Sequence, residues 1–327
     1  MTYVLDINNL QIDVTKDGQT HNVVKDVSLT IKKQQIYGIV GESGSGKSLT
    51  ALSIMGLLAS PPLHISKGEI VFEEQQLLEK SAREMRKVRG KDISMIFQEP
   101  MTALDPLFTI EDQLMEALRF HTKLSKKEMK KACIDIVDRV GIPRPAEVVK
   151  EYPHQLSGGM RQRIMIAIAM LCNPKLLLAD EPTTALDVTI QAQILDLMKE
   201  LKDDFDTSIL MITHDLGVIA ETCERVAVMY AGEIVEESDV VSIFHSPKHP
   251  YTQGLLKSMV SGDRGDELYS IPGKVPSVEN MPAGCRFATR CPHVMDICHD
   301  HTPDVKEVAQ DHTCQCWLYQ EELVHNG

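Results

Sequence analysis

Gly41-Glu42-Ser43-Gly44-Ser45-Gly46-Lys47-Ser48 is the stretch of this sequence that decides the fold. It matches a phosphate-binding loop at every fixed position, and it lies between a predicted buried strand at residues 35–40 and a predicted helix at residues 49–58. In such a loop the glycines let backbone N–H groups converge on phosphates, Lys47 supplies a positive charge and Ser48 ligates Mg²⁺. We therefore expect a nucleoside triphosphate to contact these residues and the helix that starts at Leu49.

The composition describes an ordinary globular protein, since 43% of the 327 residues are hydrophobic and 25% are charged. This length is enough for one large domain and a smaller one. The 34 Lys and Arg residues against 47 Asp and Glu residues give a net charge of −13, which disfavours nucleic acid as a partner. No apolar run approaches the roughly 18 residues of a membrane span. No secretion signal is visible at the start, so we expect a cytosolic chain with reduced cysteines.

The periodicity of apolar residues predicts an α/β fold. Residues 2–36 alternate apolar and polar, with a turn at Asp17-Gly18, which is typical of an antiparallel β layer. Continuous apolar strands imply a parallel sheet covered on both faces, and they are predicted at residues 93–98, 175–180, 208–213 and 226–230. Other segments predict a strand at residues 68–72 and helices at residues 79–89, 164–171, 190–201 and 239–260.

The chain divides into two predicted domains. Residues 1–260 form a nucleotide-binding domain, in which amphipathic helices over about residues 101–165 interrupt the α/β pattern as a helical subdomain. Beyond Gly262 the periodicity fades, and glycine, proline, histidine and cysteine dominate. We therefore expect residues 261–327 to form a small loop-rich cysteine domain, stabilised by something other than a large core.

Two adjacent carboxylates end the predicted strand at residues 175–180. Asp180 is placed to hold Mg²⁺, directly or through water, and Glu181 can polarise the water that attacks a phosphate. Adjacent acids at a strand end are often only solvated loop residues, but the intact phosphate loop upstream favours the catalytic interpretation. The combination predicts hydrolysis of the bound nucleotide.

A second anion site is predicted at Leu156-Ser157-Gly158-Gly159, just before a helix. Ser157 caps the helix, and Gly158 and Gly159 expose its N-terminal N–H groups. With this motif the chain resembles the ATP-binding subunits of ABC transporters, whose Leu-Ser-Gly-Gly signature it carries unaltered. The resemblance implies that the signature faces the γ-phosphate of ATP bound to another subunit, in a head-to-tail dimer of nucleotide-binding domains.

The resemblance implies roles for further residues. Gln98 matches the glutamine that contacts Mg²⁺, the attacking water and the membrane partner. Asp187 ends Thr184-Ala185-Leu186-Asp187, which matches the loop along the dimer seam, and His214 matches the histidine that contacts the γ-phosphate. The chain departs from the family in having no Phe, Tyr or Trp at positions 4–36 to stack on adenine. Candidates to replace that contact are Tyr3, His21 and Val14.

A narrower resemblance is to the ATP-binding subunits of oligopeptide, dipeptide and nickel importers. It rests on residues 98–106, 156–165, 246–256 and 284–319. It implies an ATPase on the cytoplasmic face of the membrane that powers uptake of oligopeptides or dipeptides. The implied partners are two membrane-spanning permease subunits, a second ATPase that is identical or homologous, and indirectly an extracytoplasmic solute-binding protein. The alternatives are the same role in a nickel or metallophore importer and a soluble ABC ATPase acting on nucleic acid or ribosomes.

Five of the eight cysteines crowd into the C-terminal region. Four thiolates suit zinc or an iron–sulfur cluster, but the short paired spacings of zinc ribbons are missing. The family resemblance favours a [4Fe–4S] cluster bound by Cys285, Cys291, Cys298 and Cys316. Cys314 is the rival for the last position, His293, His299 and His312 are spare donors, and a set of unliganded thiols is a further alternative. The remaining cysteines, Cys133, Cys172 and Cys223, are predicted to pack in the core.

Overall fold

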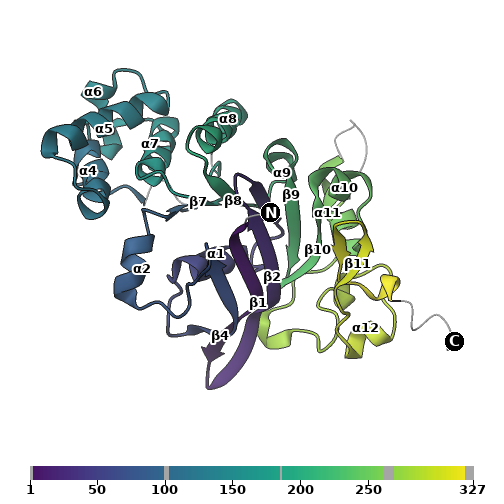
Figure 1. Ribbon diagram of the computed structural model, residues 1–327. Coiled ribbons are helices and arrows are strands. Elements are labelled where there is room, and N and C mark those ends of the chain that lie inside the picture. Colours follow the sequence, from purple (N-terminus) through teal and green to yellow (C-terminus); the bar gives the residue numbers. More distant parts are fainter. Residues whose placement is uncertain (1–2, 99–102, 185, 261–268, 321–327) are drawn as a thin grey trace. The chain divides into compact units, whose positions relative to one another are not determined.

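The structure is a computed structural model that describes residues 3–98, 103–184, 186–260 and 269–320 (Figure 1). The chain forms two compact units. The first contains Met1–Val4, Ile31–Ile36 and Glu79–Ile212. The second contains Leu5–Thr30, Tyr37–Leu78 and Thr213–Gly327. The predicted boundary between residues 260 and 261 falls at the edge of a segment outside the described residues, so the division into an ATPase domain and a cysteine domain stays a prediction.

The first unit contains three parallel strands that are buried along their whole length. They are β6 (Ile93–Ile96), β7 (Leu176–Asp180) and β8 (Ser208–Thr213). The first unit ends at Ile212, one residue before the end of β8. In register, Ile96 lies beside Ala179 and Asp180 beside Ile212. Unbroken apolar runs allow this double-sided burial, as predicted. The carboxyl end of β7 is the position at which Asp180 and Glu181 stand.

The helical part of the first unit gathers α4 (Ile110–His121), α5 (Lys126–Arg139), α6 (Pro145–Val148), the short η1 (Pro153–Gln155) and α7 (Gly158–Met170) (Figure 1). On α4 the residues at helical spacing are buried, which confirms the predicted apolar face: Ile110, Leu114, Met115 and Leu118. Ser125 caps α5 in a capping box with Glu128. The start of the predicted helical subdomain, at residues 101–102, lies outside the described residues.

The second unit contains the predicted antiparallel layer. β1 (Tyr3–Lys16) and β2 (Gln19–Lys32) are joined at Asp17 and Gly18, both with positive φ, as a two-residue hairpin requires. β4 (Leu63–Phe72) pairs with β1, and β5 (Gln75–Gln76) pairs with β4. The strand predicted at residues 68–72 is therefore longer at its start. The expectation of an antiparallel β layer ahead of the parallel strands is confirmed.

The core sheet is mixed, whereas we predicted parallel strands only. β3 (Ile36–Val40) pairs in parallel with β9 (Arg225–Tyr230), but β9 pairs antiparallel with β10 (Glu233–Asp239). β12 (His312–Cys314) and β11 (Lys306–Ala309) continue this edge antiparallel. The reason is the tight turn at Ala231 and Gly232, where both residues have positive φ and the chain reverses directly.

Several predicted helices differ in their ends. α1 (Lys47–Met55) starts at the phosphate loop and stops before Gly56, which adopts the left-handed conformation. α2 (Ala82–Val88) is shorter than predicted because Ser81 caps it. The helix predicted at residues 239–260 is two helices, α10 (Val240–His245) and α11 (Pro250–Val260), because Pro247 disfavours helix at Ser246. α8 (Val188–Asp204) and α9 (Leu216–Thr222) complete the longer helices.

The C-terminal part is built from short elements, as predicted for a loop-rich segment. They are η2 (Val278–Asn280), η3 (Ala288–Arg290), α12 (Ile297–Asp300) and η4 (Trp317–Tyr319). Their main-chain groups bond locally, for example Cys285 N–H to Cys298 O at 2.8 Å. None of the helices in the described part of the chain has the length and apolar character needed to cross a bilayer.

Candidate nucleotide site

The phosphate loop wraps around its lysine. Lys47 is 5% exposed, and its Nζ donates to the main-chain oxygens of Gly41 at 2.7 Å and of Glu42 at 2.9 Å. No side chain caps α1, because its N-cap is Gly46 in the left-handed conformation. The first-turn N–H groups of an uncapped helix, together with a lysine, form a site for phosphate. The loop thus has the geometry that the motif predicts.

Two glycines of the loop are required by close packing in the second unit. A Cβ on Gly41 would lie 2.0 Å from the main-chain oxygen of Met229 on β9. Gly46 has φ of 99°, and a Cβ there would meet Met229 Cε at 2.9 Å. The turn after β9 also bonds the loop, since Gly232 N–H donates to Ser45 O at 2.9 Å. The loop is therefore positioned by β9 and its turn as well as by its own sequence.

Glu181 is held in a defined position at the end of β7. Its N–H donates to Ile212 O at 2.8 Å, and its φ of 49° is an uncommon backbone conformation for glutamate, of a kind that clusters at functional sites. Gln98 Nε2 donates to Glu181 Oε2 at 3.1 Å, and Thr184 Oγ1 donates to the same oxygen at 2.8 Å. Asp180, one residue earlier, is 5% exposed. The structure therefore brings together Gln98 and Glu181, which the sequence predicted separately.

The signature segment starts α7 in the predicted manner. Ser157 Oγ accepts the N–H of Met160 at 3.3 Å, and a Cβ on Gly159 would lie 3.2 Å from Ile190 Cγ2 on α8. Asp187 caps α8 by accepting Ile190 N–H at 2.9 Å. Gly159 therefore lets the starts of α7 and α8 approach closely.

One residue of this region was missed by sequence reasoning. Gln162 on α7 is 1% exposed, and its Nε2 donates to the main-chain oxygen of Pro182, which directly follows Glu181. This bond ties the signature helix to the carboxylate segment. A buried amide inside a helix is a weak signal in sequence, because only the fold shows what it reaches.

The remaining predicted nucleotide contacts lie in both units. In the loop, Ser43 and Gly44 are exposed, Ser45 is buried, and Ser48 and Leu49 are half-buried. His214 follows β8 and is exposed, as is the signature residue Gly158. Of the candidate adenine contacts, Tyr3 is exposed, and His21 and Val14 are half-buried. The roles assigned to all of these residues stay predictions.

The cysteines predicted as ligands belong to the second unit, and burial raises the pKa of three of them. The pKa of Cys285 rises to about 12, that of Cys316 to about 11, and that of Cys291 also rises. In each case the N–H two residues later opposes the shift by bonding the sulfur, as His293 N–H does to Cys291 Sγ at 3.4 Å. Neighbouring thiolates raise these pKa values further, with Cys298 acting on all three. The thiols therefore lie within electrostatic range of one another.

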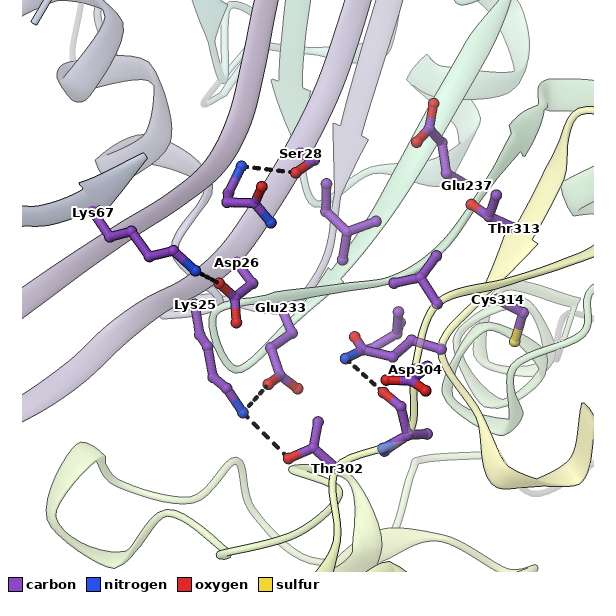
Figure 2. Close-up of a pocket in the computed structure, with 16 residues that line it drawn as sticks. Lys25, Asp26, Ser28, Lys67, Glu233, Glu237, Thr302, Asp304, Thr313 and Cys314 are labelled. Carbon is purple, nitrogen blue, oxygen red and sulfur yellow. Dashed lines mark hydrogen bonds and ion pairs between the residues drawn. The ribbon is translucent and has the colours of Figure 1, made fainter. Parts of the chain in front are cut away.

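Cys314, the rival ligand, has a different setting. It lies on β12 opposite Glu236 of β10, and it lines a pocket of about 590 Å³ (Figure 2). Figure 2 shows that charged side chains of this pocket are paired, Lys25 Nζ with Glu233 Oε1 at 3.2 Å and Lys67 Nζ with Asp26 Oδ1 at 3.3 Å. Cys314 is thus a strand residue of the sheet, and it also lies within electrostatic range of Cys316 and Cys285, so the choice between Cys314 and Cys316 stays a prediction.

The arrangement of the possible donors limits which metal they can bind. Among the described residues, no group of three or more His, Cys, Asp or Glu side chains is arranged to hold a metal ion. A single zinc ion needs donors that converge on one point, so this arrangement does not fit zinc. A multi-iron cluster accepts thiolates that are farther apart, and hydrogen bonds to its sulfurs are a usual feature. The bond from His293 N–H to Cys291 Sγ is of that kind, and the cluster itself stays a prediction. Of the other cysteines, Cys133 and Cys223 are buried, as core packing predicts, whereas Cys172 is only half-buried.

Comparison with known proteins agrees with this geometry. Residues 24–184 match the family "ABC transporter", and residues 235–298 match "Oligopeptide/dipeptide transporter, C-terminal region". Among curated proteins, the chain is 50% identical to the oligopeptide transport ATP-binding protein AppD of Bacillus subtilis over 98% of both chains. It is also 50% identical to the dipeptide transport ATP-binding protein DppD of that organism, over 99% of this chain and 97% of DppD.

A solved structure is similar in fold. The dimeric post-hydrolysis state of the ATP-binding cassette MJ0796, bound to ADP and Pi, is 28% identical with a TM-score of 0.65, and the match covers 72% of this chain and 98% of MJ0796. The phosphate loop, the signature and the carboxylate strand lie within the range that matches the ABC transporter family, and AppD and DppD match nearly the whole chain. The chain belongs to the ATP-binding proteins of the oligopeptide/dipeptide ABC transporter family.

Proposed function

We propose that this protein hydrolyses ATP to drive the uptake of oligopeptides or dipeptides, as the ATP-binding subunit of an ABC importer. The observation that carries the proposal is the paired hold on Glu181 by Gln98 and Thr184. A carboxylate fixed in this way can accept a proton from the attacking water. AppD and DppD share half of their residues with this chain and are named as oligopeptide and dipeptide transport proteins. This similarity supports peptides as the substrate class.

The nucleotide contacts follow from the loop and the motifs. The N–H groups of residues 43–49 and the Lys47 ammonium bind the phosphates, with Gly41 allowing the loop to close. Ser48, Gln98 and Asp180 hold Mg²⁺, which neutralises phosphate charge when it is bound. A carboxylate as buried as Asp180 needs a cation or strong hydrogen bonds, so its setting fits this role. His214 contacts the γ-phosphate.

The active site is completed by a second subunit. We infer that Ser157, Gly158 and Gly159 act on ATP bound to a partner ATPase, and that Asp187 lines the seam between the two subunits. Support comes from Gly158 and Gly159, whose first-turn N–H groups precede the N–H of Met160 that Ser157 caps, and from the dimeric cassette structures to which the chain is similar. The further partners are two membrane-spanning permease subunits and, indirectly, an extracytoplasmic solute-binding protein. The chain then lies peripherally on the cytoplasmic face of the membrane, and alone it turns over ATP slowly.

The test is peptide uptake by the reconstituted importer. Permease subunits, the second ATPase and this chain are placed in liposomes, and ATP-driven accumulation of labelled di- and oligopeptides is measured. Glu181→Gln should retain binding of an ATP analogue but abolish uptake and ATP turnover, because the base for the attacking water is lost. Glu200→Gln, at an exposed carboxylate on α8, is the matched control and should behave as the unchanged protein.

Two results would contradict parts of the proposal. Normal ATP turnover by the Glu181→Gln complex would remove Glu181 from its catalytic role. Accumulation of nickel or a nickel chelate in place of peptide would keep the ATPase but replace its substrate class. Stimulation of turnover by nucleic acid or ribosomes, without any permease, would instead favour the soluble class of ABC ATPase.

For the cysteine set we propose a [4Fe–4S] cluster bound by Cys285, Cys291, Cys298 and Cys316. The support is the family resemblance of residues 284–319 and the N–H···S bonding, such as that from His293 N–H to Cys291 Sγ at 3.4 Å, which stabilises thiolates. Anaerobically purified protein should contain iron and acid-labile sulfide, and Cys291→Ser should lower both, whereas Cys172→Ser should not. Protein without iron or sulfide would exclude the cluster, and zinc found in such protein would contradict the geometric argument against zinc, whereas its absence would leave free thiols.

A further inference from the structure

Within the phosphate loop at residues 41–48, Glu42 is the residue with no proposed nucleotide contact. Its main-chain oxygen, its N–H group and its carboxylate each form a hydrogen bond with another residue. Its main-chain oxygen accepts Lys47 Nζ at 2.9 Å. Its N–H donates to the hydroxyl of Tyr251 at 3.0 Å. Its carboxylate accepts Arg290 Nη1 at 3.2 Å through Oε1 and at 3.0 Å through Oε2. All four residues belong to the second unit, and two of them come from far downstream in the chain.

The Arg290 side chain also forms contacts with residues other than Glu42. Its Nε donates to Pro272 O at 2.9 Å, and its Nη2 donates to Ile271 O at 3.3 Å. The guanidinium lies 5.7 Å from the ring centre of Tyr230 at the end of β9. The Arg290 side chain is only 5% exposed, whereas that of Glu42 is 30% exposed. A planar guanidinium with several fixed donors can satisfy all of these contacts at once, and a lysine cannot.

The segment that carries Arg290 packs on the phosphate-loop region through aromatic side chains. Phe287 is 2% exposed and lies 5.1 Å from Tyr230, 5.5 Å from Tyr251 and 5.7 Å from His249, measured between ring centres. Tyr230 and Tyr251 contact each other at 4.7 Å. Aromatic pairs at these distances attract each other beyond their buried area. The hydroxyl that binds Glu42 N–H is therefore part of a closed cluster.

A second connection runs through the turn after β9. Arg286 is 5% exposed, and its Nη1 donates to the main-chain oxygen of Ala231. Its Nη2 donates to Asn22 Oδ1 on β2 at 2.8 Å. The next residue of the turn, Gly232, donates its N–H to Ser45 O. The short stretch from Arg286 to Arg290 thus meets the phosphate loop at Glu42 and, through the turn, at Ser45.

We infer that Arg290 is a positioning residue for ATP binding, and that the C-terminal segment is part of the nucleotide site through it. The inference rests on the proposed ATP site at residues 41–48. Arg290 neutralises the Glu42 carboxylate, which otherwise stands beside bound phosphates and repels them. It also fixes the peptide groups around Glu42, whose oxygen anchors the phosphate-binding Lys47. A loop that is preorganised in this way binds nucleotide without a further ordering cost.

The test is a double-mutant cycle in nucleotide affinity with the full chain. Binding of a fluorescent, non-hydrolysable ATP analogue with Mg²⁺ is measured for Arg290→Gln, Glu42→Gln and the double variant. Arg290→Gln should weaken binding about tenfold, the effect of losing one hydrogen bond between charged groups. Glu42→Gln should cost less, because it leaves no bare carboxylate. The double variant should bind more tightly than Arg290→Gln, since removing Glu42 relieves the repulsion.

The controls separate this inference from the site on which it rests. Lys16→Gln breaks another ion pair to the C-terminal segment, that with Glu279, and should leave binding within about twofold. If Lys47→Ala still binds the analogue normally, the proposed phosphate site itself is wrong. If Lys47→Ala abolishes binding but the affinity of Arg290→Gln stays within about twofold of the unchanged protein, only the positioning role is wrong. A lower melting temperature of Arg290→Gln would then show that Arg290 contributes to stability alone.

Two further results complete the test. Affinity losses of the two single variants that simply multiply in the double variant also refute the positioning role. Should Arg290→Gln not fold, Arg290→Lys replaces it in the cycle. Arg290→Lys keeps the positive charge but loses the rigid, planar set of donors of the guanidinium. It should therefore weaken nucleotide binding less than Arg290→Gln does and more than Lys16→Gln does.

Discussion

Replacing Thr184 by valine tests how Glu181 is held at the end of β7. Thr184 Oγ1 donates to Glu181 Oε2 at 2.8 Å, and Gln98 Nε2 donates to the same oxygen at 3.1 Å. Valine has nearly the same shape as threonine but has no hydroxyl, so Thr184→Val removes one of the two donors without opening a cavity. The carboxylate is then free to turn away from the position in which it can accept a proton from water.

The expected magnitude follows from the strength of the lost bond. A hydrogen bond to a charged group contributes about 1.5 to 3 kcal/mol, and the lower end applies here because Gln98 is exposed and water reaches the carboxylate. About 1.4 kcal/mol corresponds to a factor of ten. We therefore expect kcat for ATP to fall about tenfold. KM should change by less than about twofold, because the lost interaction orients the base and does not bind the nucleotide.

The assay is steady-state ATP turnover by the assembled importer at saturating Mg·ATP. Thr184→Ser is the matched control, because it keeps the hydroxyl and should retain most of the activity. If the kcat of Thr184→Val stays within about twofold of the unchanged complex, the bond does not orient Glu181. The same conclusion follows if Thr184→Ser is as slow as Thr184→Val, since the effect would then come from side-chain shape.

Two further predictions concern stability and loop geometry. Burial lowers the pKa of His249 from 6.5 to about 3, and Nδ1 accepts Tyr251 N–H at 3.0 Å, so the folded state keeps it neutral. The unfolded state takes up this proton, so stability should fall as pH drops below about 6.5, by up to about 1.4 kcal/mol per pH unit. Urea unfolding of His249→Asn between pH 7 and 5 should lack this contribution, and an unchanged slope contradicts it. Gly41→Ala places a methyl group 2.0 Å from Met229 O and should weaken ATP-analogue binding more than about tenfold. Gly18→Ala strains only its own turn, where φ is +77°, and its methyl group meets nothing within 4 Å, so it should bind normally, and equal losses would refute this steric argument.

Much of the nucleotide site could be predicted from the sequence because its chemistry uses contiguous residues. A loop that wraps phosphates needs glycines and a lysine at fixed spacing, and a serine such as Ser157 before two glycines predicts the start of a helix. The buried face of α4 was equally predictable, because helical periodicity is a local property. These features depend on neighbours in the chain, so a short window of sequence contains them.

Only the tertiary structure decided which distant residues meet. Gln98 reaches Glu181 across 83 positions of sequence, and Arg290 reaches Glu42 across 248. In neither pair does the sequence around one residue indicate the other, because these contacts depend on how strands and turns pack in the folded chain. The antiparallel β10 was not predicted for the same reason, since its direction depends on the turn at Gly232. Its sequence is also rich in glutamate, so it does not resemble the buried strand that it forms. The phosphate loop is thus specified by its own eight residues, whereas the support that holds Glu42 in place exists only once the chain has folded.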